Sequence, residues 1–157
     1  MTARQIAQAT SANSMVLRRW LGAWVDFIAL FLIFVVVAGI FGEDDFGLVL
    51  TLDIVLIACY FIVLEAKLGW TAGKLLTGLR VVDDSGKPPG VKAAMIRTLL
   101  RLFEVNPFLL GGIPAGIAVN YSQARQRLGD MAAGTYVVPK KELDKISAYE
   151  VDPSVFA

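Results

Sequence analysis

The chain has 157 residues and a net charge of +1, and 56% of its residues are hydrophobic while 18% are charged. Its mean hydropathy of +0.62 is too high for an ordinary water-soluble domain and favours a membrane as the solvent. The sequence contains no histidine, which argues against histidine-based catalysis and zinc binding, and its near-neutral charge argues against a nucleic-acid partner. We therefore expect no enzymatic activity, no bound metal and no cofactor.

The segment 21–41, LGAWVDFIALFLIFVVVAGIF, has one charged residue, Asp26. As a helix it has about the length that crosses a bilayer core of roughly 30 Å. A signal peptide is the alternative, because two arginines precede the segment and VAG at 37–39 resembles a cleavage site. The apolar core is too long for that and is interrupted by Asp26, so we predict an uncleaved transmembrane helix.

A second span is predicted at 46–64, FGLVLTLDIVLIACYFIVL, which contains Asp53 and follows the first span after the short linker GEDD. The two spans should form an antiparallel helical hairpin. The first twenty residues carry three arginines and no acid, the turn at 42–47 carries three acids and no base, and residues 65–101 carry seven bases and three acids. By the positive-inside rule, the N-terminus lies on the cytoplasmic side of the membrane and the protein is multi-pass.

The third apolar segment, LFEVNPFLLGGIPAGIAVNY at 102–121, is interrupted by a glutamate, an asparagine, two prolines and a pair of glycines. It either crosses the membrane or enters and returns as two half-helices, which lipid tolerates only where protein or water satisfies the freed backbone groups. We favour a kinked or re-entrant segment at 105–121, because a full crossing would place the basic C-terminal residues outside.

Two ten-residue segments share one pattern, GKLLTGLRVV at 73–82 and GDMAAGTYVV at 129–138. Each predicts a helix, a glycine that ends it and a short strand. Exposed strand edges cannot lie in hydrocarbon, so the strands should pair with each other at the cytoplasmic face. This pairing also favours the re-entrant interpretation, since both copies must lie on one side of the membrane.

The segment VKAAMIRTLLRLFE at 91–104 predicts a basic amphipathic helix in the plane of the interface. Lys92, Arg97 and Arg101 are its candidate contacts to lipid headgroups, and Val91, Met95, Leu99 and Leu102 form its apolar stripe. The predicted fold is thus an all-α membrane protein with a small two-stranded β element. Its membrane domain covers 16–139, between a polar N-terminal tail at 1–15 and a cytoplasmic tail of low order at 140–157.

Arg19 and Asp26 are seven positions apart and share one helix face, separated by roughly 10 Å along the axis. An aspartate inside a span costs roughly 2.5 to 3.5 kcal/mol on insertion scales and needs compensation. One interpretation is a proton or cation site. The other is a structural ion pair that anchors the bundle.

Lys74 and Asp130 occupy the same position in the two copies of the repeat. A lysine near a helix C-terminus is favoured by the helix dipole, whereas an aspartate there needs a basic partner. The candidates for that partner are Arg19, Arg97, Arg127 and Lys74. Glu65 lies at a depth similar to Arg18 and Arg19 and is expected to pair there, and Asp53 is expected to reach the outer interface.

Four segments in this order resemble the RDD family of prokaryotic integral membrane proteins over residues 16–138: RRWLGAWVDFIAL, GWTAGKLLTGLRVVDDSGKPPG, AMIRTLLR and QRLGDMAAGTYVV. The arginine and first aspartate that name the family match Arg19 and Asp26. The second aspartate matches Asp130, with Asp53 as the alternative. The resemblance implies a module of the prokaryotic inner membrane and points to transport of cations or protons, without naming a substrate.

Two functions follow from these patterns. The first is a small transporter or cation/proton exchange module, in which Arg19, Asp26, Asp130, Lys74 and Glu65 form the polar path. Two spans and a re-entrant segment are too few to enclose a path, so this function requires a homo-oligomer. The second is an accessory or scaffold subunit of a larger membrane complex, or a protein that binds lipid headgroups.

Overall fold

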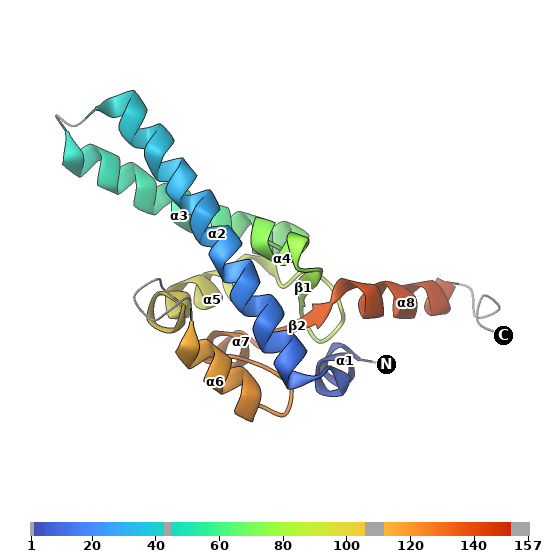
Figure 1. Cartoon of the computed structure of the whole chain (residues 1–157). Helices are drawn as coiled ribbons and strands as arrows, with labels where there is room; N and C mark the ends of the chain where they lie inside the picture. Colours follow the sequence, from blue (N-terminus) through green and yellow to red (C-terminus); the bar gives the residue numbers. More distant parts are fainter. Residues whose placement is uncertain (1, 43–44, 106–111, 152–157) are drawn as a thin grey trace.

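The computed structural model describes residues 2–42, 45–105 and 112–151. Two long helices, α2 (Ala12–Phe41) and α3 (Phe46–Leu68), form an antiparallel hairpin that projects from the rest of the molecule (Figure 1). They match the predicted spans, but α2 begins nine residues before 21 and α3 ends four residues after 64. In the described part of the chain, these two helices are long and apolar enough to cross a membrane. Two residues of the predicted acidic turn, 43 and 44, lie outside the described residues.

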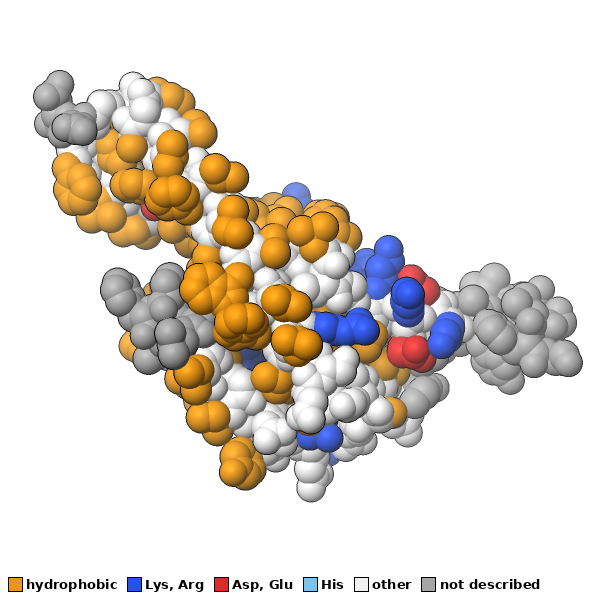
Figure 2. Space-filling model, in the orientation of Figure 1, with side chains coloured by type: hydrophobic (Ala, Val, Ile, Leu, Met, Phe, Trp, Pro, Cys, Tyr) orange, Lys and Arg blue, Asp and Glu red, His pale blue; other side chains and the backbone are white. Residues whose placement is uncertain are grey.

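Apolar side chains cover the hairpin on its outside, as Figure 2 shows for one face. Phe31, Ile40 and Ile54 are among the most exposed of them. A helix this apolar would be covered by protein in a water-soluble domain, whereas a lipid environment accepts apolar side chains on its surface. The hairpin therefore has the surface expected of a membrane-spanning pair.

The remaining elements form a folded unit at the base of the hairpin, which we call the body (Figure 1). They are α1 (Ala3–Ala9), α4 (Ala72–Leu76), β1 (Leu79–Val82), α5 (Gly90–Glu104), α6 (Ile113–Tyr121), α7 (Leu128–Ala132), β2 (Tyr136–Pro139) and α8 (Lys140–Val151).

The two strands pair antiparallel, with Val81 opposite Val137. These two valines occupy equivalent positions in the sequence repeat, so the two copies are related by a local two-fold axis at this pair. Each strand follows a short helix and a glycine with positive φ, Gly78 at 68° and Gly134 at 61°. A left-handed residue that ends a helix favours glycine, which explains why both copies keep it.

The sheet separates two apolar clusters, because successive side chains of a strand point to opposite faces. Val82 and Val138 pack into one cluster, and Val81 and Val137 into the other. The first cluster also contains Ile6 from α1 and Leu143 from α8.

The predicted tails need correction on this evidence. Residues 3–9 form α1, whose helix start is closed by hydrogen bonds between Thr2 and Gln5, and whose buried side chains cover the sheet. Residues 140–151 form α8, which packs on β2, while 152–157 lie outside the described residues. Both segments are ordered because their few apolar side chains complete the core over the strands.

The segment 102–121 is not one continuous helix. Its first residues end α5 at Glu104, and α6 begins at Ile113. With nine residues, α6 is about 13 Å long, which is short of the roughly 30 Å of a bilayer core. Residues 106–111 of the predicted kinked segment lie outside the described part of the chain.

A close backbone contact joins α4 to α2. A Cβ atom added at Gly73 would lie 1.9 Å from the carbonyl oxygen of Gly22. No side chain fits in that space, so the glycine that starts the first repeat lets α4 lie directly against the hairpin.

Candidate functional site

The hairpin meets the body at a buried cluster of charged side chains, which we call the ion-pair network. It joins α2, α3, α4, α5 and α7 through five cationic and three carboxylate side chains. They are Arg19, Lys74, Arg97, Arg101 and Arg127, with Glu65, Glu104 and Asp130.

Glu65, in the last turn of α3, is one centre of this network and its side chain is fully buried. It accepts hydrogen bonds from Lys74 Nζ at 2.7 Å, from Arg97 Nε at 2.7 Å and from Arg101. The guanidinium of Arg101 also stacks on the ring of Phe61, with its Cζ 3.7 Å from the ring centroid. The expected pairing of Glu65 with Arg18 or Arg19 is wrong, because α4 and α5 bring Lys74, Arg97 and Arg101 to it instead.

Asp130, the second centre, is also fully buried and binds three arginines. Its carboxylate lies 2.5 Å from Arg97 Nη1, 2.6 Å from Arg19 Nη1 and 3.0 Å from Arg127 Nε. Burial on its own raises the pKa of Asp130, but the three arginines outweigh burial and hold this pKa well below its usual range. The prediction that Asp130 needs a basic partner is confirmed for these three candidates.

Arg97 connects the two centres, since it contacts both Glu65 and Asp130 and donates a further hydrogen bond to Thr135 Oγ1 at 2.6 Å. Its side chain is fully buried. Arg97 and Arg101 therefore lie inside the protein. The prediction from the helix pattern, that both contact lipid headgroups, is wrong. Lys92, on the same helix, is exposed, and its headgroup contact stays a prediction.

Lys74 does not contact Asp130, although the two share a position in the repeat. The path between them runs through Glu65 and Arg97. Burial lowers the pKa of Lys74 to about 8, and the neighbouring Glu65 opposes that shift. At neutral pH the lysine is thus a cation held by one carboxylate.

Glu104 extends the network toward α7. It accepts a hydrogen bond from the backbone N–H of Gly129 at 2.8 Å and lies 3.8 Å from Arg127 Nε. Burial raises the pKa of Glu104, and Arg127 and the Gly129 hydrogen bond oppose the increase.

Asp26 lies beside the network and has its own partners. Its Oδ1 accepts hydrogen bonds from Tyr60 and from the backbone N–H of Gly73, and its Oδ2 accepts one from Thr71, all at 2.8 Å. Gly73 and Gly129 open the two copies of the repeat, so in each copy the first glycine donates its N–H to a buried carboxylate.

Arg19 and Asp26 therefore serve different partners. The guanidinium of Arg19 donates to Asp130 at 2.6 Å and to the carbonyl oxygen of Arg125 at 2.9 Å. The absence of a direct contact between Arg19 and Asp26 follows from their separation along α2, and each ties the hairpin to a different part of the body.

Asp53 stands apart, about two turns from the start of α3, and is 8% exposed. Its Oδ1 has no hydrogen-bond partner among the described residues. Its expected reach to the outer interface stays a prediction. Within the described residues, no three His, Cys, Asp or Glu side chains lie close enough together to bind a metal ion.

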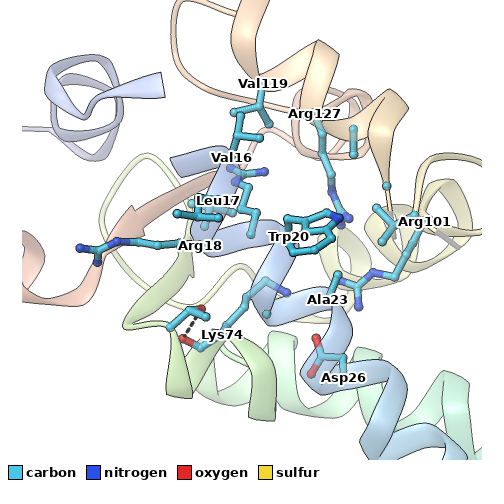
Figure 3. A pocket seen from close by; sticks show the side chains of 18 of the residues that line it. Val16, Leu17, Arg18, Trp20, Ala23, Asp26, Lys74, Arg101, Val119 and Arg127 are labelled. Atoms are coloured by element: carbon cyan, nitrogen blue, oxygen red, sulfur yellow. Dashed lines mark hydrogen bonds between the residues drawn. The ribbon is translucent and has the colours of Figure 1, made fainter. Parts of the chain in front are cut away.

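A cavity of about 560 Å³ lies between α2, α4, α5 and α6, beside the network (Figure 3). Among its charged lining residues, Asp26 is the single acid. The bases are Arg18, Arg19, Lys74, Arg97, Arg101 and Arg127. In Figure 3, Lys74, Arg101 and Arg127 point from three different elements toward the space around Trp20, while Arg18 points away.

Four members of this site were missed from the sequence: Tyr60, Thr71, Glu104 and Thr135. A general signal existed, because a buried carboxylate or guanidinium must find hydrogen-bond partners. Which donors and acceptors come close depends on how α2, α3, α4 and α5 pack, and no local pattern encodes that.

Residues 14–134 match the sequence model of the RDD family. This match covers most of the chain and includes Arg19, Asp26 and Asp130. Neither the curated proteins nor the solved structures contain a match to the chain.

Proposed function

Because the chain belongs to the RDD family of membrane proteins, we propose that it is a non-enzymatic accessory module of a larger membrane assembly. In this proposal the hairpin anchors the protein in the prokaryotic inner membrane and the body lies on the cytoplasmic side, an orientation that the arginines near the N-terminus support by the positive-inside rule. The observation that carries the proposal is that the acidic and basic candidates for a transport path are held by the fold itself.

Asp26 supports this proposal most directly. Its carboxylate accepts three hydrogen bonds from neutral donors on α3 and at the start of α4. A carboxylate that must release and rebind a cation needs free lone pairs and water, whereas Asp26 is 5% exposed and ties two elements to α2. Its role is to position α4 against the hairpin.

The charge of the network is a second argument. Five cationic side chains surround three carboxylates, so the potential at the junction repels cations. A path for protons or metal cations through this region meets that repulsion on entry. Along the hairpin beyond Asp26, the next charged side chain in the described residues is Asp53, which is about 10 Å along α3 from Tyr60, the residue of α3 that contacts Asp26.

Ion flux tests the proposal. The purified protein, with its oligomeric state verified, is placed in liposomes that contain a pH-sensitive dye, and proton movement is followed after a pulse of sodium or potassium. We expect no cation-dependent flux above that of empty liposomes. Flux that disappears in Asp26→Asn and persists in Asp144→Asn, an exposed aspartate on α8, overturns the proposal in favour of cation/proton exchange.

An accessory role also requires a partner. We expect a lipid-facing photo-crosslinker on the hairpin, at the exposed Ile54, to give a discrete adduct with another membrane protein in native membranes. Adducts with lipid alone, at several crosslinker positions around α2 and α3, contradict the accessory role.

A further inference from the structure

The cavity beside the ion-pair network has a surplus of positive charge. Five cations of the network line it, and they share three carboxylates. Counting Asp26 as a fourth carboxylate still leaves the cations in excess. A buried surplus of charge is costly unless a counter-ion neutralises it.

The same side chains carry hydrogen-bond donors without acceptors. Arg19 Nε, Arg97 Nη2, Arg101 Nε and Arg127 Nη2 are buried and have no hydrogen-bond partner among the described residues. The side chains of Arg97 and Arg127 are 0% and 7% exposed, so bulk water does not compensate them. A bound oxyanion accepts several such N–H groups at once, and these charge-assisted hydrogen bonds are the strong ones.

The remainder of the cavity wall is apolar and reaches the surface. Its lining includes Leu17 and Trp20 from α2 and Ile113 and Ile117 from α6, each between 41% and 56% exposed. Figure 2 shows that hydrophobic side chains continue from the hairpin down one side of the body. A ligand that reaches the cavity across this rim comes from an apolar environment.

We infer that the cavity binds an anionic amphiphile from the bilayer, with its phosphate or carboxylate head on the guanidinium groups and its acyl chain along α2 and α6. A volume of about 560 Å³ accommodates a headgroup and the first part of a chain. The inference rests on the proposed function only in placing the body against the membrane. It assigns no task to Asp26.

Native mass spectrometry of the whole protein, released from nanodiscs, tests this. Discs contain phosphatidylcholine with either phosphatidylglycerol or a fatty acid, and a third sample receives inorganic phosphate alone. We expect an anionic lipid to be retained at one copy per chain, at least about tenfold over phosphatidylcholine, and phosphate not to displace it. Equal retention of both phospholipids, or displacement by millimolar phosphate, overturns the inference.

Two pairs of variants locate the binding. Ala115→Phe fills the apolar part of the cavity, and Ala118→Phe adds the same ring to α6 at a position that does not line it. We expect the first to reduce retention of the anionic lipid about tenfold and the second to leave it unchanged. Equal effects of both variants overturn the site.

Arg101→Gln removes one charge from the cavity and leaves Glu65 paired with Lys74 and Arg97, whereas Lys92→Gln removes one exposed charge from the same helix. We expect loss of anion selectivity in Arg101→Gln alone. Equal loss in both indicates general surface attraction and overturns the inference. Since Ala115→Phe leaves the network intact, the test survives if Arg101→Gln fails to fold. The two experiments are independent: ion flux in liposomes would contradict the proposed function, whereas the inference depends on lipid retention alone.

Discussion

The carboxylate of Asp130 pairs with three arginines, and the guanidinium of Arg97 pairs with two buried carboxylates. Burying such charges has a high desolvation cost, so the network adds little stability compared with a well-packed apolar core. Removing one partner is different, because the remaining charges stay buried without compensation. The network therefore specifies how the elements fit together more than it raises the free energy of unfolding.

Asp130→Asn keeps the shape of the side chain and removes its charge. Because Arg97, Arg19 and Arg127 then lose a common counter-charge, we expect the free energy of unfolding to fall by about 3 to 5 kcal/mol. Thermal unfolding in detergent, followed by circular dichroism, measures the change. Asp144→Asn on α8 is the control, and a loss below about 1 kcal/mol for Asp130→Asn contradicts a central role.

The pH dependence of stability follows from the same residue. The pKa of Asp130 lies well below its ordinary value of 3.8 in the folded protein, so the unfolded chain binds the proton more tightly. The contribution of Asp130 is fully present above about pH 5 and is lost as the pH falls below 3.8 toward the folded pKa. We expect the midpoint temperature of thermal unfolding to fall as the pH is lowered below about 4 in the native protein, and to fall less in Asp130→Asn. Parallel pH profiles contradict this assignment.

At the scale of elements, α4 is held against α2 by contact between backbones. Gly73 lies on Gly22, and its N–H donates to Asp26 at 2.8 Å. The contact and the hydrogen bond depend on each other, since a side chain at either glycine moves the helices apart. The first repeat is thus fixed to the hairpin by one glycine and one carboxylate.

Gly73→Ala tests this contact. The new Cβ would lie 1.9 Å from the carbonyl oxygen of Gly22, which is too close for any contact. α4 must therefore move, and the hydrogen bond from the Gly73 N–H to Asp26 is lost. We expect a loss of about 1 to 3 kcal/mol, as for an overpacked core, in chemical or thermal unfolding. Gly39→Ala, also in a helix, is the control because a Cβ there meets no atom within 4 Å, and it should be neutral or stabilising. Equal effects of both variants contradict the close contact.

The elements differ in how well the sequence predicted them. Hydrophobic length predicted the hairpin, and the repeated glycine and valine spacing predicted two strands, because these signals are local. The helices α1 and α8 have few apolar residues, and only docking on the sheet orders Ile6 and Leu143. For α5, the apolar stripe is exposed as predicted, but the partners of Arg97 are 32 and 33 residues away, and no periodicity identifies such distant acids.

For the candidate site, the sequence identified Asp130 and three of its four candidate partners correctly, but it could not identify the partners of Asp26. Asp130 was expected to bind arginines because an aspartate near a helix C-terminus is unfavourable. That premise is wrong, since Asp130 lies in the first turn of α7 and also accepts a hydrogen bond from the backbone N–H of Arg127 at 3.2 Å. Its need for basic partners follows from its burial instead. Tyr60 and Thr71 could not be found this way. Their contacts with Asp26 exist only once α2, α3 and α4 are packed.

For the whole molecule, the β pairing links the two halves of the chain across the body. β1 follows the hairpin and α4, and β2 follows α6 and α7, so the chain between the two strands leaves the sheet and returns to it. Because the strands are paired, we expect Ser85 and Lys141, which flank them, to lie on one side of any membrane that the hairpin crosses. The pairing of Val81 with Val137 is the observation on which this expectation rests.

Cysteine labelling tests this topology. In a Cys59→Ser background, which removes the single native cysteine, new cysteines replace the exposed residues Arg4, Ser85 and Lys141 on the body, or Phe46 at the far end of the hairpin. Because α1 packs on β2, we expect a membrane-impermeant maleimide to label all three body positions in inside-out vesicles and to label Phe46→Cys in intact cells. Labelling of Ser85→Cys and Lys141→Cys from opposite sides requires the strands to separate, and it excludes the sheet as the core of the membrane-bound protein.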